Sequence, residues 1–330
     1  MGQTATLKKI STQLNLSIST VSRALKNHPD ISENTKRKVK ELAALMEYEP
    51  NSYAVNLRTN KSRVFGLIVP AISNTFYDSF IAAAEEDARK SGYTLMILQS
   101  GDDPEKESDN LKLCRHYRVD GILICVTSSS YSSEVFAKYQ EAGIPLVFFD
   151  KVPEMGNYDT ICMADEEAAT IAAHTILKFK KKNVLALFGN PDISITKKRR
   201  EAFCKIMEKE KGVQTAIQYC SDTEEARVAT TTEINKSPRP DHIFCMSDEI
   251  LIGVMKALKH SDLKIPADIS VLAISNGFIP GLFTPEITYV ETSGHELGKL
   301  AMKRMLEQMN GRTEPRSIIL PSRLVEGGSL

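Results

Sequence analysis

The stretch Val64-Phe-Gly-Leu-Ile-Val69-Pro-Ala-Ile-Ser-Asn-Thr-Phe-Tyr77 begins as a continuous apolar run and ends in polar turn residues. A short run of this kind is typical of a strand that is buried on both faces of a parallel sheet. Apolar residues at helical spacing follow directly, namely Phe80, Ile81, Ala84 and Ala88. The order of strand, polar turn and amphipathic helix predicts the first βαβ unit of an α/β domain.

The same alternation continues to the end of the chain and predicts two doubly wound parallel-sheet lobes. We expect further strands at 94–98, 121–126, 145–149, 184–188, 242–246, 269–274, 288–290, 317–320 and 323–325. We expect the helices that separate them near 106–117, 134–141, 166–179, 196–209, 224–235, 250–259 and 296–309. The predicted ligand-binding body, 63–330, divides into an N-lobe (about 63–161 plus 292–321) and a C-lobe (about 162–291 plus 322–330), with a cleft between them.

Polar and aromatic residues follow several of these strands, and ligands of open α/β sheets bind beyond the carboxyl ends of the strands. The candidates are Ser73, Asn74, Phe76, Tyr77, Asp150, Ser247, Asp248, Ser275 and Asn276. Hydroxyls, amides and carboxylates can hydrogen-bond a polyhydroxylated ligand while a ring covers its apolar face. For each residue singly the alternative is turn chemistry or helix capping, which we favour for Ser247 and Asp248. Convergence at several strand ends nevertheless favours a binding site.

Before this body lies a short basic segment, 1–49, with helical periodicity. Leu7, Ile10 and Leu14 mark a first helix. Asn15 tolerates the left-handed conformation of a tight turn, and Ser17 can cap a second helix.

The second helix, 18–25, should bury Val21, Ala24 and Leu25 and expose Ile18, Ser19, Ser22 and Arg23. In a third helix, capped by Ser32, an apolar stripe of Val39, Leu42, Ala43 and Met46 lies beside Lys36, Arg37, Lys38 and Lys40. Three helices with a tight turn between the first two describe a helix-turn-helix unit. A generic three-helix bundle fits the spacing equally well.

Charge and composition restrict the function further. Residues 1–62 hold ten Lys/Arg and five Asp/Glu, whereas the remaining residues hold 32 and 37, so a basic head precedes an acidic body. Only the head is therefore expected to meet a polyanion. The six cysteines show no metal spacing and suggest buried, reduced thiols. No signal peptide, membrane span or catalytic motif is evident, so we expect a cytoplasmic protein that is not an enzyme and uses no cofactor or metal.

Four ordered blocks of the head resemble the LacI/GalR family of bacterial transcription regulators. They are Ser17-Ile-Ser-Thr-Val-Ser-Arg-Ala-Leu25, His28-Pro-Asp-Ile-Ser-Glu-Asn-Thr-Lys-Arg37, Tyr48-Glu-Pro-Asn51 and Leu57-Arg-Thr59. The body is similar over nearly its full length to the ligand-binding domain of that family, itself similar to periplasmic sugar-binding proteins; matching blocks include Gly66-Leu-Ile-Val-Pro70 and Pro266-Ala-Asp-Ile-Ser-Val271. Asn15 and Glu47 depart from the family pattern, because both stand where Gly is common.

The resemblance implies roles for particular residues. In such proteins the second helix enters the major groove, so the DNA-binding set in the helix-turn-helix is Ser17, Ile18, Ser19, Thr20, Ser22, Arg23 and Asn27. Ile18 and Ser19 would discriminate bases, Arg23 would reach a guanine or a phosphate, and Thr20, Ser22 and Asn27 suit phosphates. The segment 50–62 would be a hinge helix, in which Leu57 wedges into the minor groove while Asn51, Asn56 and Arg58 contact backbone or groove.

In the body the resemblance assigns Asp150 as a pocket acid and Arg199 as a ligand-clamping residue. Ser275-Asn276-Gly277 and Ala71 stand where sugar-responsive members often have Asp. With Arg199 present, we hypothesise a sugar acid or another anionic metabolite as the effector. Alternatively, Lys197-Lys-Arg-Arg200 is simply a solvated basic run.

The expected protein is a ligand-responsive repressor of carbohydrate or sugar-acid metabolism genes. It would bind pseudo-palindromic double-stranded operator DNA as a homodimer and would make no use of a membrane. The alternative is a sugar-binding protein or a metabolic enzyme of the two-lobed α/β fold, because such folds are often enzymes.

Overall fold

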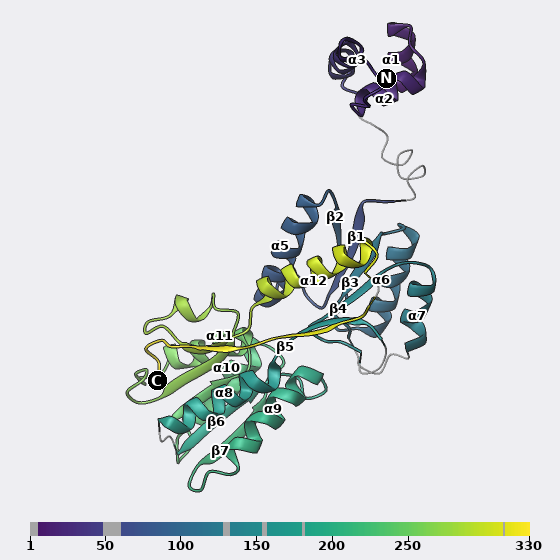
Figure 1. The fold of residues 1–330 in the computed structure, drawn as a ribbon. Coiled ribbons are helices and arrows are strands. Elements are labelled where there is room, and N and C mark those ends of the chain that lie inside the picture. Colours follow the sequence, from purple (N-terminus) through teal and green to yellow (C-terminus); the bar gives the residue numbers. More distant parts are fainter. Residues whose placement is uncertain (1–5, 49–60, 128–132, 154–156, 180–181, 313) are drawn as a thin grey trace. The chain divides into compact units, whose positions relative to one another are not determined.

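A computed structural model describes residues 6–48, 61–127, 133–153, 157–179, 182–312 and 314–330. The chain divides into two compact units, Met1–Ser62 and Arg63–Leu330, and each is considered by itself (Figure 1). The expected hinge residues Asn51, Asn56, Leu57 and Arg58 lie outside the described residues.

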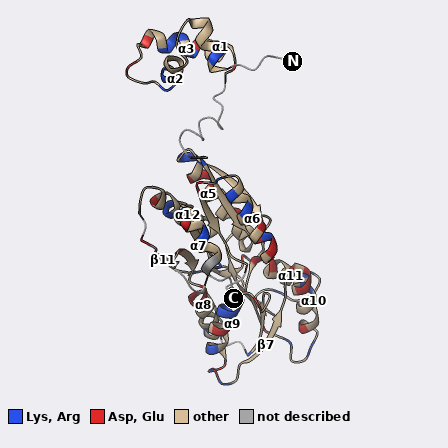
Figure 2. Cartoon of the chain, turned by 90° about the vertical axis from the view of Figure 1, so that its right-hand side faces the viewer, with Lys and Arg blue, Asp and Glu red and all other residues tan. Residues whose placement is uncertain are grey.

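The first unit contains three helices: α1 (Leu7–Leu14), α2 (Ile18–Leu25) and α3 (Glu33–Leu45). Their apolar stripes meet in a small core in which Ile10, Val21 and Val39 are fully buried. The helix-turn-helix architecture predicted from the spacing is therefore confirmed. Figure 2 shows Lys and Arg on these helices, of which only α3 also carries acidic residues.

Two positions in this unit have the left-handed backbone that glycine usually supplies. Asn15 ends α1 with φ 51°, and Glu47, just after α3, has φ 49°. The tight turn at Asn15 is thus as expected, whereas Glu47 adopts a conformation that is strained for an ordinary side chain. Lys36 is buried, with its ammonium 2.7 Å from Glu33, whereas Arg37, Lys38 and Lys40 are exposed.

The N-lobe of the second unit is built on a six-stranded sheet in the order β11-β5-β4-β3-β1-β2, with every neighbouring pair parallel. Its strands are β1 (Val64–Val69), β2 (Thr94–Gln99), β3 (Gly121–Ile124), β4 (Leu146–Phe149), β5 (Asp159–Met163) and β11 (Ser317–Leu320). Its helices are α5 (Thr75–Lys90), α6 (Pro104–His116), α7 (Ser133–Glu141) and α12 (Gly294–Met309).

Both faces of this sheet are buried, because successive strand residues point into two different cores. Phe65, Leu67 and Val69 pack with residues of α5 and α12. Ile68, between Leu67 and Val69 in the sequence, belongs to the core that contains residues of α6 and α7. The continuous apolar run of β1 therefore packs against a helix layer on each face of the sheet.

The C-lobe repeats the plan with the sheet order β12-β10-β9-β8-β6-β7. Its strands are β6 (Asn183–Phe188), β7 (Gln214–Tyr219), β8 (His242–Cys245), β9 (Ser270–Ser275), β10 (Thr288–Glu291) and β12 (Arg323–Val325). Its helices are α8 (Asp165–Lys178), α9 (Ser194–Met207), α10 (Thr223–Ile234) and α11 (Asp248–Lys259), and the short η1 (Pro280–Leu282) lies between β9 and β10. Helices α8 and α9 pack as one pair and α10 and α11 as another, on opposite faces of the sheet (Figure 2).

Three features differ from the expectation. Strands β5 and β7 were not predicted, because polar residues interrupt both: Asp159 and Thr160 in β5, and Gln214, Thr215 and Gln218 in β7. Strand β12 pairs antiparallel with β10, so the C-lobe sheet is mixed at one edge. All other elements that we predicted in the body, 63–330, are present, with ends shifted by a few residues at most.

The chain crosses between the lobes three times, and each crossing is short. Ala164 alone separates β5 from α8, Thr292 and Ser293 separate β10 from α12, and residues 321–322 separate β11 from β12. Figure 1 shows the last crossing as the yellow C-terminal segment. Because β5 extends to Met163 in the N-lobe sheet, the first crossing lies two residues beyond the expected lobe boundary.

All six thiols are free, and five of them are buried while Cys162 is half-buried. Burial raises the pKa of the Cys114 thiol to about 12, so such thiols stay protonated and unreactive. In the part of the chain that the structure describes, no helix is both long and apolar enough to cross a membrane.

Candidate functional site

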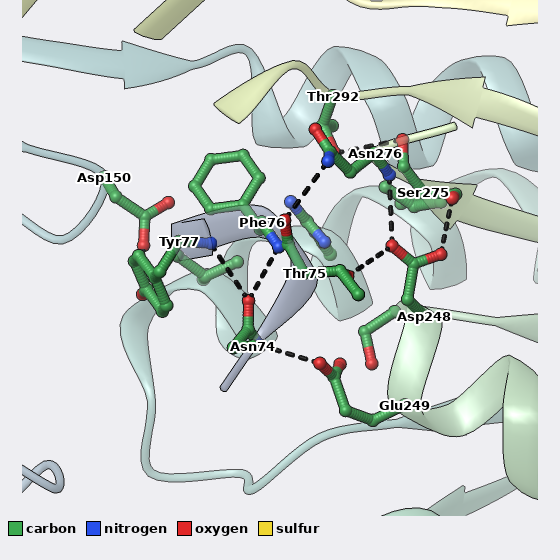
Figure 3. Close-up of a pocket in the computed structure, with 14 residues that line it drawn as sticks. Asn74, Thr75, Phe76, Tyr77, Asp150, Asp248, Glu249, Ser275, Asn276 and Thr292 are labelled. Atoms are coloured by element: carbon green, nitrogen blue, oxygen red, sulfur yellow. Dashed lines mark hydrogen bonds between the residues drawn. The ribbon is translucent and has the colours of Figure 1, made fainter. Parts of the chain in front are cut away.

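A pocket of about 120 Å³ lies between the two lobes, where the carboxyl ends of β1, β4, β8 and β9 meet. Nine of the ten predicted ligand-binding residues line it (Figure 3). Ser73 is the exception, because it is exposed and outside the lining. Five further residues complete the lining: Thr75, Ile195, Glu249, Ile274 and Thr292. Thr75 and Glu249 could have been predicted from the sequence, since each adjoins a predicted residue.

Asn74 caps α5 and also contacts the opposite lobe. Its Oδ1 accepts hydrogen bonds from the N–H groups of Phe76 (3.0 Å) and Tyr77 (3.3 Å). Its Nδ2 donates to Glu249 Oε1 of the C-lobe at 2.7 Å. The residue therefore satisfies both the capping interpretation and the site interpretation.

Ser247 and Asp248 differ in role: one caps a helix, and the other belongs to the hydrogen-bond network of the pocket. Ser247 is the N-cap of α11, as we favoured. Asp248 instead accepts hydrogen bonds from the Ser275 hydroxyl, the Asn276 N–H and, across the cleft, the Thr75 hydroxyl at 3.1 Å. Burial raises the pKa of Asp248, while these donors act in the opposite direction. For Asp248 the capping interpretation is wrong, because its carboxylate joins the lobes.

The side chain of Asn276 reaches from the C-lobe into the N-lobe (Figure 3). Its Nδ2 donates to the Thr75 carbonyl oxygen at 3.2 Å, and its Oδ1 accepts from the Gly294 N–H at 3.0 Å and the Ser79 hydroxyl at 3.3 Å. We call the hydrogen bonds that Asn276, Asp248 and Glu249 make to the N-lobe the interlobe clasp. Three of the predicted residues, Asn74, Asp248 and Asn276, thus make hydrogen bonds across the cleft.

Asp150 is the acid that the N-lobe contributes to the pocket. It directly follows β4 in the left-handed conformation, with φ 60°. Its Oδ2 accepts a hydrogen bond from the Tyr77 hydroxyl at 2.6 Å and a weak one from the Cys125 thiol at 3.7 Å. Burial raises the pKa of Asp150, and the negative charge of Asp165 adds to the effect. Its Oδ1 accepts no hydrogen bond from the residues that the structure describes, which leaves it for a ligand.

Arg199 lies on α9, one turn after Ile195, and is buried, whereas Lys197 and Lys198 are exposed. The solvated-run interpretation is therefore wrong for Arg199. Its Nε donates to Asp165 Oδ1 at 2.8 Å. Asp165 opens α8 and was not predicted, because the pairing joins residues 34 positions apart. The positive charge that we expected to favour an anionic ligand is already neutralised.

In the head, the predicted DNA-binding residues of α2 form an exposed, mostly polar face. Ser17 caps the helix, with its hydroxyl 3.0 Å from the Thr20 N–H. Ile18 is 48% exposed, although it is apolar. Five of the predicted DNA-binding residues are exposed, namely Ser17, Ile18, Ser19, Arg23 and Asn27, and two are half-buried, namely Thr20 and Ser22.

Two of these side chains have partners within the head. Arg23 lies 3.9 Å from the Asp30 carboxylate, and both side chains are solvent-exposed, so this ion pair is weak. Asn27 Oδ1 accepts a hydrogen bond from Lys40 at 2.5 Å. Both contacts are at the surface, and DNA phosphates or bases could replace them.

Comparison with known proteins identifies relatives for both units. The family described as "Bacterial regulatory proteins, lacI family" matches residues 6–51. The family described as "Periplasmic binding proteins and sugar binding domain of LacI family" matches residues 62–327.

Individual relatives match over almost the whole chain. The HTH-type transcriptional repressor PurR of Vibrio atlanticus (strain LGP32) is 26% identical over 318 residues, which are 95% of each chain. The Ribose operon repressor of Haemophilus influenzae (strain ATCC 51907 / DSM 11121 / KW20 / Rd) is 25% identical over 320 residues, 96% of each. Among solved structures, the lac repressor dimer bound to operator and the anti-inducer ONPF has a TM-score of 0.87 at 20% identity and covers 99% of both chains.

Proposed function

The chain belongs to the LacI family of bacterial regulatory proteins, and on that basis we propose that it is a ligand-responsive repressor that binds operator DNA through its helix-turn-helix unit. The observation that carries the proposal is the presence, in one chain, of matches to the DNA-binding head and to the ligand-binding body of that family. The relatives named above are repressors. We propose no catalytic reaction for the protein.

For operator recognition we propose the exposed face of α2. Ile18 and Ser19 stand at the start of the helix, where side chains reach base edges, and Arg23 can donate to a guanine or a phosphate. The hydroxyls of Thr20 and Ser22 and the amide of Asn27 suit phosphates. A single helix-turn-helix makes few base contacts, so we propose a two-fold dimer on a pseudo-palindromic operator.

For the effector we propose a sugar-sized polar molecule in the interlobe pocket. Asp150 offers an acceptor oxygen, and Phe76 offers a ring face beside it, a combination that suits a polyhydroxylated ligand. The lobes already contact each other through the interlobe clasp. Effector binding therefore competes with or reinforces that clasp, and the resulting population shift between lobe arrangements is the proposed origin of the response.

Titration of a pseudo-palindromic operator library tests the DNA-binding proposal. We expect Leu57→Ala to weaken operator binding sharply, since we propose that Leu57 inserts into the minor groove. Leu45→Ala is the matched control, because Leu45 is an 83% exposed leucine of α3. Equal operator affinity for both variants would refute the assignment of Leu57.

A thermal-shift screen against sugars and nucleobases, followed by operator titration with any ligand found, tests the effector proposal. A ligand that changes operator affinity supports a regulator. The absence of DNA binding under every ligand condition would reject the repressor, and chemical turnover of a ligand would support an enzyme instead.

A further inference from the structure

Arg199 keeps part of its hydrogen-bonding capacity in the pocket, but the carboxylate of Asp165 compensates its positive charge. Its Nη1 donates to the Met246 carbonyl oxygen at 2.9 Å, while Nε and Nη2 lie 2.8 Å and 2.7 Å from Asp165 Oδ1. Both side chains of the ion pair are at most 10% exposed. A guanidinium carries five N–H groups, so about two remain for a ligand.

The other charged groups of the lining are all acidic. Asp150, Asp248 and Glu249 line the pocket, and Arg199 is the one cation among the lining residues that the structure describes. The nearby buried cation, Lys151, pairs with Asp102 and is not part of the lining. An anion in the pocket would therefore meet three carboxylates and one cation that is already paired.

We propose that Asp165 is a specificity-determining residue: by pairing with Arg199 it makes the pocket accept an uncharged, hydroxyl-bearing ligand and reject carboxylates and phosphates. This inference rests on the proposed function of the pocket as an effector site. The two free N–H groups of Arg199 donate to ligand oxygens, and Asp150 accepts from a ligand hydroxyl. A neutral sugar supplies both kinds of group, whereas a carboxylate supplies only acceptors and is repelled by the unpaired acids.

Isothermal titration with matched probes tests the proposal on the intact protein. The pairs are D-glucose with D-glucuronate and D-galactose with D-galacturonate, in each of which a carboxylate replaces the C6 hydroxymethyl group while the sugar ring is kept. We expect the wild type to prefer the uncharged member of any pair that it binds by at least about tenfold, since a charge-assisted hydrogen bond differs from a neutral one by roughly that factor. Comparable or tighter binding of the carboxylate, lost in Arg199→Gln, overturns the proposal.

Asp165→Asn provides the complementary measurement, because it restores the free charge of Arg199. We expect inorganic phosphate to raise the Tm of Asp165→Asn above that in chloride of equal ionic strength. The wild type and the double variant Asp165→Asn/Arg199→Gln should show no such rise. No phosphate effect in folded Asp165→Asn overturns the proposal even if no sugar of the panel binds.

If Asp165→Asn does not fold, the Tm of the wild type is compared in phosphate and in chloride. A rise in phosphate that Arg199→Gln abolishes refutes the proposal, whereas the absence of a rise in the wild type supports it. None of these measurements uses DNA. Operator titration of the wild type tests the repressor function separately, so failure of the specificity proposal and failure of the function are distinguishable.

Discussion

Replacing Asn276 with alanine tests whether the clasp holds the lobes together. The substitution removes the hydrogen bonds to the Thr75 carbonyl oxygen and the Gly294 N–H, at 3.2 and 3.0 Å. The third partner, Ser79, keeps its hydrogen bond to the Phe76 carbonyl oxygen and loses little. At about 1 kcal/mol for each of the two lost bonds, lobe separation becomes easier by about 2 kcal/mol, or about 30-fold.

Hydrogen exchange measured by mass spectrometry reports this change without labels. We expect amides at the starts of α5, α11 and α12 to exchange about 30-fold faster in Asn276→Ala, because all three helix starts contribute to the clasp. Asn235→Ala is the matched control, since Asn235 ends α10 at the surface and its side-chain Nδ2 donates to the carbonyl oxygen of Thr231 in the same helix. Equal protection of the three helix starts in both variants would refute the reasoning.

Three further predictions concern stability. Gly294→Ala should disrupt the contact between α12 and α5 and lower the Tm, because the new Cβ would lie 2.2 Å from a backbone oxygen of α5. Gly281→Ala is the control and should leave the Tm unchanged, because Gly281 has open space around it. Burial raises the pKa of the Glu107 carboxyl to about 7, from 4.5. Because the folded state then binds the proton more tightly than the unfolded state, Glu107 lowers the free energy of unfolding as pH rises from about 4.5 through 7. Urea unfolding at several pH values should show that Glu107→Gln removes about 3 kcal/mol of this pH-dependent loss. Arg304→Met should lower the free energy of unfolding by about 3–5 kcal/mol, because it leaves the buried Asp159 carboxylate unpaired, and adding Asp159→Asn should restore part of the loss; no recovery would contradict this account.

Most of the buried strands and the location of the site could be predicted, because both follow from local patterns. The continuous apolar run at 64–69 indicated a strand buried on two faces, and Asp150 and Asn276 were found simply by following strands to their ends. Strand β7, with its polar alternation and place at the sheet edge, gave no comparable signal.

The partners of the site residues could not be predicted, because they depend on contacts between distant segments. Nothing near Arg199 in the sequence indicated that it pairs with Asp165, and this pairing is the observation from which we propose an uncharged ligand instead of an anionic one. Lys36 shows the same limitation in the head, because its basic neighbours in the sequence do not reveal that the fold buries it and pairs it with Glu33.

The three lobe crossings fix how the body can move. Each consists of only one or two residues, so sliding or twisting one lobe against the other would strain the covalent chain at three places, whereas rotation about a common axis would not. Thr292 belongs to one crossing and also lines the pocket, with its N–H 2.9 Å from the Ser275 carbonyl oxygen. A ligand that touches Thr292 therefore acts next to the axis, where a small displacement is enlarged along the lever arm of each lobe.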